Sequence, residues 1–214
     1  MIKNNLNFFN NIQKKNLDSK SIKKFTKLFP KILSKVFTDI NSSKKTLNTL
    51  NKKFNFNFEF KDLEKFKSFK TIAIIGMGGS ILGSEAVSHF LKEKIKKKIY
   101  FFNDLNIKKI QNFKKKKNLD KVLFFVISKS GNTVETLSNF FILKIIKKNS
   151  KNIIIISEKK NNLLYSLSKK FNLFYIEHKN YIGGRYSVLS EVGIVPAYLM
   201  GININKLRSG SLKS

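Results

Sequence analysis

Five short apolar runs divide the chain after residue 70, and stretches with a helical spacing of apolar residues separate them. The runs cover residues 71–75, 99–102, 122–127, 153–156 and 173–176. The helical stretches cover residues 81–94, 107–113, 133–147 and 163–171. Continuous apolar runs of this length are typical of parallel strands that are buried on both faces. The alternation therefore predicts an α/β fold, an open five-stranded parallel sheet flanked by helices.

The first 69 residues show a different pattern and form an N-terminal helical region. Apolar residues recur every three or four positions from Ile22 to Ile40, which predicts two or three helices. Pro30 falls inside this pattern. A proline lacks the backbone donor and clashes with the preceding turn, so we expect a break or a kink there. The region carries no catalytic motif.

The chain is strongly basic, with 43 Lys and Arg against 13 Asp and Glu and a net charge of +30. Such a charge is compatible with a nucleic-acid partner. However, nearly all of it is lysine, spread over the whole chain together with asparagine, isoleucine and phenylalanine, as in proteins of AT-rich genomes. Arginine, the better reader of phosphates and bases, occurs only as Arg185 and Arg208. We therefore favour compositional drift and expect no specific nucleic acid as partner.

Other features of the composition exclude several classes of protein. There is no cysteine, and there are only two histidines, so we expect neither disulfides nor a metal site. No apolar run approaches the roughly 18–20 residues of a membrane-spanning helix, and the first residues lack the apolar core of a secretory signal. These observations predict a cytoplasmic protein without a membrane partner.

A glycine-rich loop follows the first predicted strand, with Gly76, Gly78 and Gly79 directly before Ser80. Backbone N–H groups at the start of a helix form an anion site. A dinucleotide site is the rival interpretation, but Ile81 stands where its third glycine belongs. Asp104, after the second strand, could still serve as the ribose-binding acid. A tight turn without a ligand is the third possibility.

A second loop, after the third strand, brings together the hydroxyls of Ser128, Ser130 and Thr133. Each hydroxyl can donate a hydrogen bond to a phosphate oxygen, and the following helix adds its dipole. The alternative is helix capping by Asn132 or Ser130, with Glu135 as the acid of a capping box. The loop lacks the Gly-Lys-Ser/Thr ending of a nucleotide-binding P-loop, which disfavours ATP and GTP.

A third motif starts at Gly183 and Gly184, which precede Arg185 and a stretch that runs on to Gly193. Glycines let a backbone approach a small anion closely, and the guanidinium adds a fixed charge. A surface arginine in a glycine turn is the plain alternative. Together the three loops closely resemble the phosphoglucose isomerase family, from about residue 70 to 201. The first two loops are similar to those of a sugar isomerase (SIS) domain, which implies a three-layer domain around a five-stranded parallel sheet.

The resemblance implies reversible isomerisation of glucose 6-phosphate and fructose 6-phosphate through a cis-enediolate, without a cofactor. By similarity, the phosphate is held by Ser80, Ser128, Ser130 and Thr133, with backbone from Gly79 and Lys129. Arg185 would stabilise the enediolate, and Glu135 matches a family glutamate near the active site. Gly183, Gly184 and Ser187 belong to the family's signature motif. The family also implies a homodimer at full length.

In the family, the base glutamate, the ring-opening histidine and a late lysine lie in a second SIS domain, and no match to them occurs up to Ser214. We therefore expect an N-terminal portion that is inactive alone, with residues 1–69 as the helical region, 70–201 as the SIS-type domain and 202–214 as the start of a connection. Glu177 and His178 are interpreted as ordinary loop residues. The alternatives are a non-catalytic sugar-phosphate-binding module and a basic nucleic-acid-binding protein.

Overall fold

The computed structural model describes residues 18–210 of the chain. Its centre is a sheet of five strands: β1 (Thr71–Gly76), β2 (Lys98–Phe102), β3 (Val122–Ile127), β4 (Ile153–Ser157) and β5 (Phe174–Glu177). All neighbouring strands pair in parallel, and their order is β2-β1-β3-β4-β5. The predicted α/β fold with a five-stranded parallel sheet is thus confirmed, and each strand begins and ends within a residue of its apolar run.

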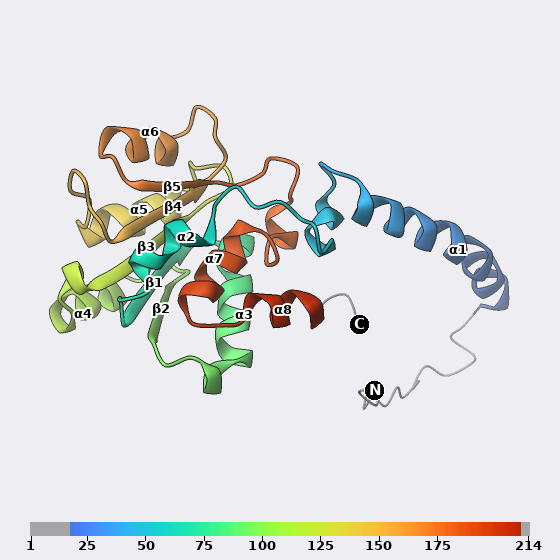
Figure 1. The fold of residues 1–214 in the computed structure, drawn as a ribbon, viewed down its shortest axis with the longest axis horizontal. Coiled ribbons are helices and arrows are strands. Elements are labelled where there is room, and N and C mark those ends of the chain that lie inside the picture. Colours follow the sequence, from blue (N-terminus) through green and yellow to red (C-terminus); the bar gives the residue numbers. More distant parts are fainter. Residues whose placement is uncertain (1–17, 211–214) are drawn as a thin grey trace.

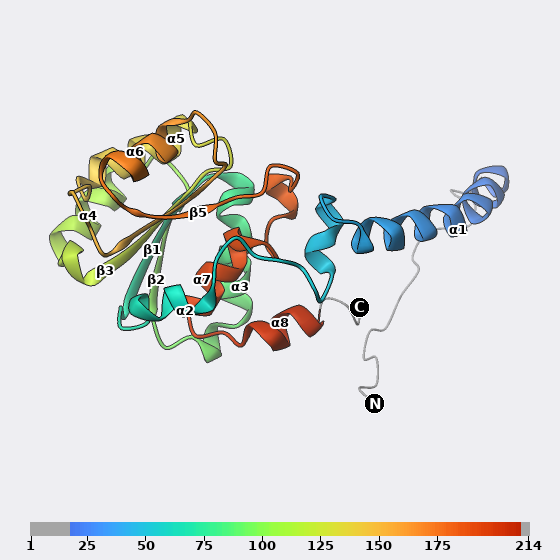
Figure 2. The same ribbon diagram turned by 45° about the horizontal axis from the view of Figure 1, so that its top comes forward.

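Helices cover both faces of the sheet and make a three-layer structure (Figure 1 and Figure 2). One face carries α4 (Ile107–Lys116), α5 (Val134–Leu143) and α6 (Leu163–Lys170). The other face carries α3 (Leu82–Phe90), α7 (Glu191–Leu199) and α8 (Ile204–Gly210), with the short α2 (Phe60–Leu63) beside them. This arrangement follows from parallel strands, because each crossover must pass over one face of the sheet.

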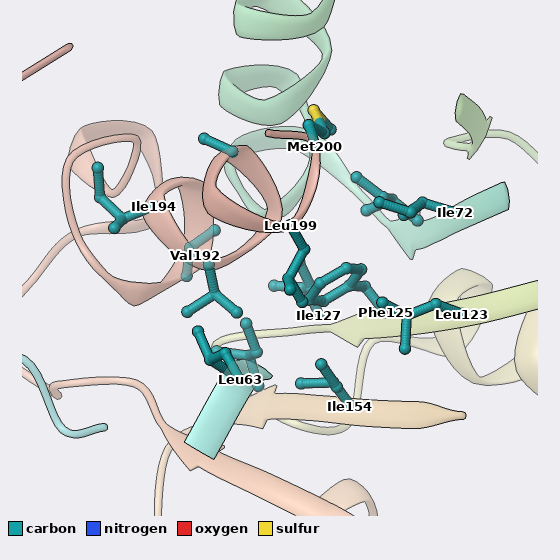
Figure 3. Packing of buried hydrophobic residues seen from close by; sticks show 14 of the residues in the cluster. Leu63, Ile72, Leu123, Phe125, Ile127, Ile154, Val192, Ile194, Leu199 and Met200 are labelled. Carbon is teal, nitrogen blue, oxygen red and sulfur yellow. The ribbon is translucent and has the colours of Figure 1, made fainter. Parts of the chain in front are cut away.

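Two buried clusters of side chains correspond to the two faces, since successive residues of a strand point to opposite sides. Ile72, Phe125 and Ile154 belong to the cluster under α7 and α8. Ala73, Phe124 and Ile155, which alternate with them, pack under α4, α5 and α6. Figure 3 shows Val192 and Leu199 of α7 directed toward the strand residues of the first cluster. The continuous apolar runs therefore reflect burial on both sides.

Two helices are shorter than their sequence pattern suggests. The helix predicted over residues 133–147 ends at Leu143, because Lys144 takes a left-handed conformation with a φ of 53° and its N–H bonds to the Phe141 carbonyl. A left-handed residue of this kind is a common helix terminator. The helix predicted over residues 81–94 ends at Phe90, and a separate 3-10 turn, η5 (Lys92–Lys94), follows it.

Residues 18–69 of the N-terminal region contain two α-helices, one long and one of a single turn, within the two or three that were expected. Helix α1 (Ser19–Asn41) is followed by a 3-10 turn, η2 (Thr46–Leu50), and by the one-turn α2 with a further 3-10 turn, η3 (Glu64–Phe66). Of the break or kink expected at Pro30, the break is wrong, because α1 continues through this residue. Pro30 only deprives the Thr26 carbonyl of its partner, and Thr26 is exposed on α1, where water can replace the lost bond.

Helix α1 extends away from the sheet, and none of its residues is buried (Figure 1). Phe25, Phe29, Ile32 and Phe37 are each more than half exposed on it. An amphipathic helix normally buries such a stripe against another element, but on α1 the stripe is exposed. Over residues 18–210, no helix is both long enough and apolar enough to cross a bilayer.

Candidate functional site

The three loops that carry the sequence motifs lie beyond the carboxyl ends of the strands. The first, with the 3-10 turn η4 (Gly78–Ser80), follows β1, and the second, residues 128–133, follows β3. The register pairs Gly76 with Ile127, so these two loops leave the sheet side by side. The strand order reverses between β1 and β3, which is the position where doubly wound sheets bind ligands. The third loop carries η7 (Gly184–Tyr186) and follows β5.

The glycines of the first loop have distinct structural reasons. Gly78 has a φ of +52°, which side-chain-bearing residues rarely adopt. A Cβ on Gly76 would lie 3.0 Å from the Ile127 carbonyl oxygen, so its absence lets β1 and β3 end close together. The N–H groups of Ser80 and Ile81 donate back to Met77 and Gly78 at 3.1 Å and close the turn.

The three hydroxyls of the second loop form a cluster, as the sequence predicted. The oxygens of Ser128 and Thr133 lie 2.8 Å apart, and Ser130 lies 3.4 Å from each. The Gly131 N–H donates to the Ser128 hydroxyl at 3.1 Å. Ser128 is buried and Ser130 is exposed, so the cluster reaches from the end of β3 to the surface. Hydroxyl donors grouped in this way suit an anion with several oxygens.

The capping role considered for Asn132 and Ser130 is wrong. Thr133 occupies the position before α5, and its side chain makes no capping bond. The Asn132 side chain instead accepts a hydrogen bond from the Leu163 N–H at 2.8 Å, at the start of α6. The Leu164 N–H donates to the Gly131 carbonyl at 3.1 Å. These contacts connect the loop to α6. None of the three hydroxyls of the cluster caps α5.

The third loop lies against the first. The Ser187 hydroxyl is 2.6 Å from the Gly184 carbonyl oxygen and 3.2 Å from that of Gly79. Arg185 is exposed and, within residues 18–210, makes no hydrogen bond or ion pair. Its guanidinium is therefore available to a ligand. The Ser190 side chain accepts from the Val192 N–H and so caps α7, which fixes the far end of this loop.

Glu135 is half-buried in the first turn of α5. Within the described part of the chain, no hydrogen bond or ion pair links Glu135 or Arg185 to the other predicted site residues. The structure thus brings together the hydroxyl cluster on one side and Gly79, Gly184 and Ser187 on the other. The dinucleotide alternative loses support at Asp104, because this carboxylate is exposed and pairs with Lys109 at 3.2 Å.

Lys129 links the second loop to the third. Its ammonium donates to the carbonyl oxygens of Asn180 and Ile182, each at 2.9 Å, and lies 3.6 Å from a carboxylate oxygen of Glu158. Glu158 is nearly buried, and Lys160 contacts its other oxygen at 2.5 Å. Sequence reasoning missed Glu158, because an acid directly after an apolar strand has no distinctive spacing.

His178 lies in the loop just after β5, as expected, but it is buried, unlike an ordinary loop residue. His178 is 1% exposed, and neither ring nitrogen has a hydrogen-bond partner. Burial, together with the nearby charge of Lys129, lowers its pKa from 6.5 to about 4. The backbone N–H of His178 donates to the Ser157 carbonyl at 2.8 Å and extends the pairing of β4 and β5 by one residue. The signal in the sequence was its position two residues after Ile176, on the same side of the strand. The interpretation of Glu177 as a loop residue is wrong, because Glu177 is the last residue of β5.

A cavity of about 790 Å³ lies at the opposite, amino-terminal ends of the strands, lined among others by Lys65, Phe66 and Phe174. It is remote from the three loops, and the sequence motifs contribute nothing to it. Within residues 18–210, no group of three or more His, Asp or Glu side chains is placed to hold a metal ion.

The parallel sheet, its strand order and the anion-type loops at the switch point define an α/β domain of the sugar isomerase (SIS) type. The phosphoglucose isomerase family model matches residues 29–212. The chain is 37% identical over 193 residues to a probable glucose-6-phosphate isomerase of Methanococcus maripaludis, covering 80% of this chain and 44% of that protein. It is 33% identical over 157 residues to the glucose-6-phosphate isomerase of Methanocaldococcus jannaschii, covering 70% and 38%. The chain belongs to the phosphoglucose isomerase family.

Two solved structures share the fold. A hypothetical protein of Thermus thermophilus superimposes with a TM-score of 0.71 at 20% identity, over 91% of this chain and 49% of that one. A glucose-6-phosphate isomerase of Chlamydia trachomatis gives a TM-score of 0.55 at 23% identity, over 68% and 28%. The chain spans less than half the length of the curated relatives described above.

Proposed function

We propose that the three loops bind a hexose phosphate and that the protein interconverts glucose 6-phosphate and fructose 6-phosphate. The observation that carries this proposal is the hydroxyl cluster of Ser128, Ser130 and Thr133, all within 3.4 Å of one another, at the switch point of the sheet. Hydroxyls and helix starts are suited to a phosphate that must bind and leave, because they supply donors without permanent ion pairs.

Each residue of the site receives a role in this proposal. Ser128, Ser130 and Thr133 donate to phosphate oxygens, and Ser80 does so from η4. The backbones of Gly79 and Lys129 complete the phosphate site. Gly183, Gly184 and Ser187 form the turn that presents Arg185, whose guanidinium lies beside the developing enediolate. Because a guanidinium does not lose its proton at physiological pH, it stabilises the oxyanion without protonating it.

The chemistry moves one carbon-bound proton from C2 to C1 and one hydroxyl proton from the C2 oxygen to the C1 oxygen. A general base takes the proton from C2 of the open-chain aldose and returns it to C1, so that the carbonyl passes from C1 to C2 through a cis-enediolate. Arg185 offsets the negative charge on the enediolate oxygens. Glu135, in the first turn of α5, is proposed to orient a neighbouring catalytic group. The base itself is not among the residues assigned above, so the activity is proposed for a protein of the relatives' full length.

The proposal also includes the division of the chain into residues 1–69, 70–201 and 202–214. Residues 70–201 form the sugar-phosphate-binding unit, and residues 202–214 lead toward a second SIS domain. The complete enzyme is proposed to be a cytoplasmic homodimer. An intact mass well above 24.8 kDa for the protein from its own cells would support the second domain.

Calorimetric titration with fructose 6-phosphate tests the proposal most directly. We expect binding of fructose 6-phosphate and none of unphosphorylated fructose at the same concentration. Arg185→Gln should weaken fructose 6-phosphate binding, whereas Lys115→Gln, which removes an exposed charge at the end of α4, should leave it unchanged. A folded protein that does not bind fructose 6-phosphate would refute the proposed function. Binding by a full-length protein that shows no turnover in a coupled isomerase assay would favour a non-catalytic module instead.

A further inference from the structure

The side chain of Lys129 is directed away from the hydroxyl cluster in which its backbone lies. Its ammonium is 2.9 Å from the carbonyl oxygens of both Asn180 and Ile182, which precede the glycine pair of the third loop. It therefore crosses from the end of β3 to the segment after β5. The side chain joins two loops that have β4 and α6 between them in the sequence.

Two of the three donors of this ammonium are used in hydrogen bonds. A lysine has three N–H donors and no acceptor. The two carbonyl oxygens take two of them, and Glu158 faces the third at 3.6 Å. Glu158 is itself held in place, because it is nearly buried and its other oxygen contacts Lys160. The side chain of Lys129 is thus bound to the segment after β5, whereas its backbone lies in the loop of the hydroxyl cluster.

The carbonyls that receive these bonds belong to the turn that leads to Arg185. Ile182 is fully buried, and its N–H donates to the Lys179 carbonyl at 3.1 Å. The Tyr186 N–H donates to the Gly183 carbonyl at 2.9 Å. Both bonds are local, within three residues, so they shape the turn but do not place it relative to the hydroxyl cluster. The long-range bonds from Lys129 supply that placement from the β3 side.

We propose that Lys129 is a positioning residue, whose side chain fixes the Arg185 loop at a set distance from the hydroxyl cluster so that one ligand can reach both. The consequence for ligand affinity rests on the proposed function. A sugar phosphate spans the two loops, with its phosphate on the hydroxyls and its reacting carbons near Arg185. Inorganic phosphate needs only the hydroxyl side. Loss of the Lys129 side chain should therefore weaken the longer ligand selectively.

The test uses Lys129→Met, which keeps the length of the side chain but removes its charge and donors. The matched control is Lys97→Met, because Lys97 also donates to a carbonyl, that of Lys67 at 2.8 Å, but lies at the amino end of β2. Both variants lose one positive charge, so they have the same net charge. We expect Lys129→Met to bind fructose 6-phosphate about tenfold more weakly and inorganic phosphate within about twofold of the wild type. Lys97→Met should match the wild type with both ligands.

Hydrogen exchange provides a readout that does not depend on the proposed function. In Lys129→Met without ligand, the amides of Ile182, Tyr186 and Ser187 should exchange roughly tenfold faster, while those of β1 and β3 stay unchanged. Lys129→Arg keeps the charge and the donors and should restore most of the protection. Unchanged exchange in all three amides would overturn the proposal, as would an equal loss of affinity for fructose 6-phosphate and phosphate.

A second variant covers the case in which Lys129→Met does not fold. Glu158→Gln removes the charge that faces the ammonium but keeps an oxygen and the size of the side chain. It should raise exchange in the same segment, by less than Lys129→Met, and absence of any change there would overturn the proposal. A wild-type protein that fails to bind fructose 6-phosphate would refute the proposed function, while the exchange result would still decide whether Lys129 positions the loop.

Discussion

The backbone of Gly79 lies directly against that of Gly184, so that a Cβ on Gly79 would overlap the Gly184 carbonyl. The Ser187 hydroxyl bridges the same two residues through their carbonyl oxygens. Two loops more than a hundred residues apart in the sequence thus meet backbone to backbone. This contact places the turn with Arg185 next to the glycine-rich turn after β1, which is the arrangement that the proposed function requires.

The first prediction concerns this contact. Gly79→Ala should destabilise the protein by about 1–3 kcal/mol, the usual cost of an overpacked site, because backbone atoms must move to admit the methyl group. Gly184→Ala is the matched control, since a Cβ on Gly184 would meet no atom within 4 Å. Urea unfolding of both variants checks the difference. Equal stability of the two variants would contradict the close packing of the loops.

The second prediction concerns the hydroxyl cluster. Thr133→Val keeps the shape of the side chain but removes the oxygen that lies 2.8 Å from Ser128. Affinity for fructose 6-phosphate should fall about threefold to tenfold, the worth of one hydrogen bond. Thr136→Val, on the same helix, is the control, because the Thr136 hydroxyl is buried and has no partner. Its removal should leave the affinity unchanged and the stability unchanged or higher. Calorimetric titration of both variants with fructose 6-phosphate tests this prediction. An equal effect of the two substitutions on affinity would argue against a phosphate at the cluster.

Much of this architecture was predictable from the sequence. The apolar runs located the strands to within a residue, because strands buried on both faces leave no polar position to blur their ends. The meeting of the first two motifs at one edge follows from parallel strands alone. The contact of Gly79 with Gly184 did not follow, because it depends on how the chain runs after β5.

Other features depend on tertiary context that a linear pattern does not contain. The apolar spacing in α1 located the helix. Whether the helix could continue through Pro30 depended on whether water could reach the Thr26 carbonyl. A charged residue such as Lys129 looks alike in sequence whether it faces solvent or two carbonyls. His178 is buried because the pairing of β4 and β5 extends past Glu177, and the apolar run stops before that point.

The third prediction concerns Glu191, a fully buried carboxylate at the start of α7. It accepts a hydrogen bond from the Asn57 N–H at 3.1 Å and lies 4.0 Å from the Lys179 ammonium. Burial raises the pKa of Glu191 above its ordinary value. The folded state therefore holds this proton more tightly than the unfolded chain, and the stabilisation from protonation is lost as pH rises through the folded pKa.

Two substitutions separate the charge of Glu191 from its hydrogen bond. Glu191→Gln keeps an oxygen for the Asn57 N–H but has no charge, so it should flatten the decline in stability as pH rises above the ordinary pKa of a glutamate, 4.5. Glu191→Ala leaves the Asn57 N–H and the Lys179 ammonium without this partner and should cost about 3 kcal/mol. Urea unfolding between about pH 4 and pH 8 measures both effects. A steeper pH dependence in Glu191→Gln than in the wild type would contradict the raised pKa.

The last prediction concerns acid and His178. Because burial holds the pKa of His178 at about 4, the folded state binds this proton less readily than the unfolded chain, whose value is 6.5. Stability should be complete above pH 6.5 and fall as pH drops toward 4, by about 3 kcal/mol at the limit. Burial is the largest cause of the lowered pKa; Lys129 lowers it further, and Glu158 raises it by less.

His178→Leu should remove this part of the acid sensitivity without loss of stability at neutral pH, because neither ring nitrogen has a partner to lose. The control is His89→Gln, which changes an exposed histidine and leaves the surroundings of His178 intact. A His178→Leu profile that keeps the wild-type slope between pH 4 and pH 6.5 would show that the acid sensitivity arises elsewhere.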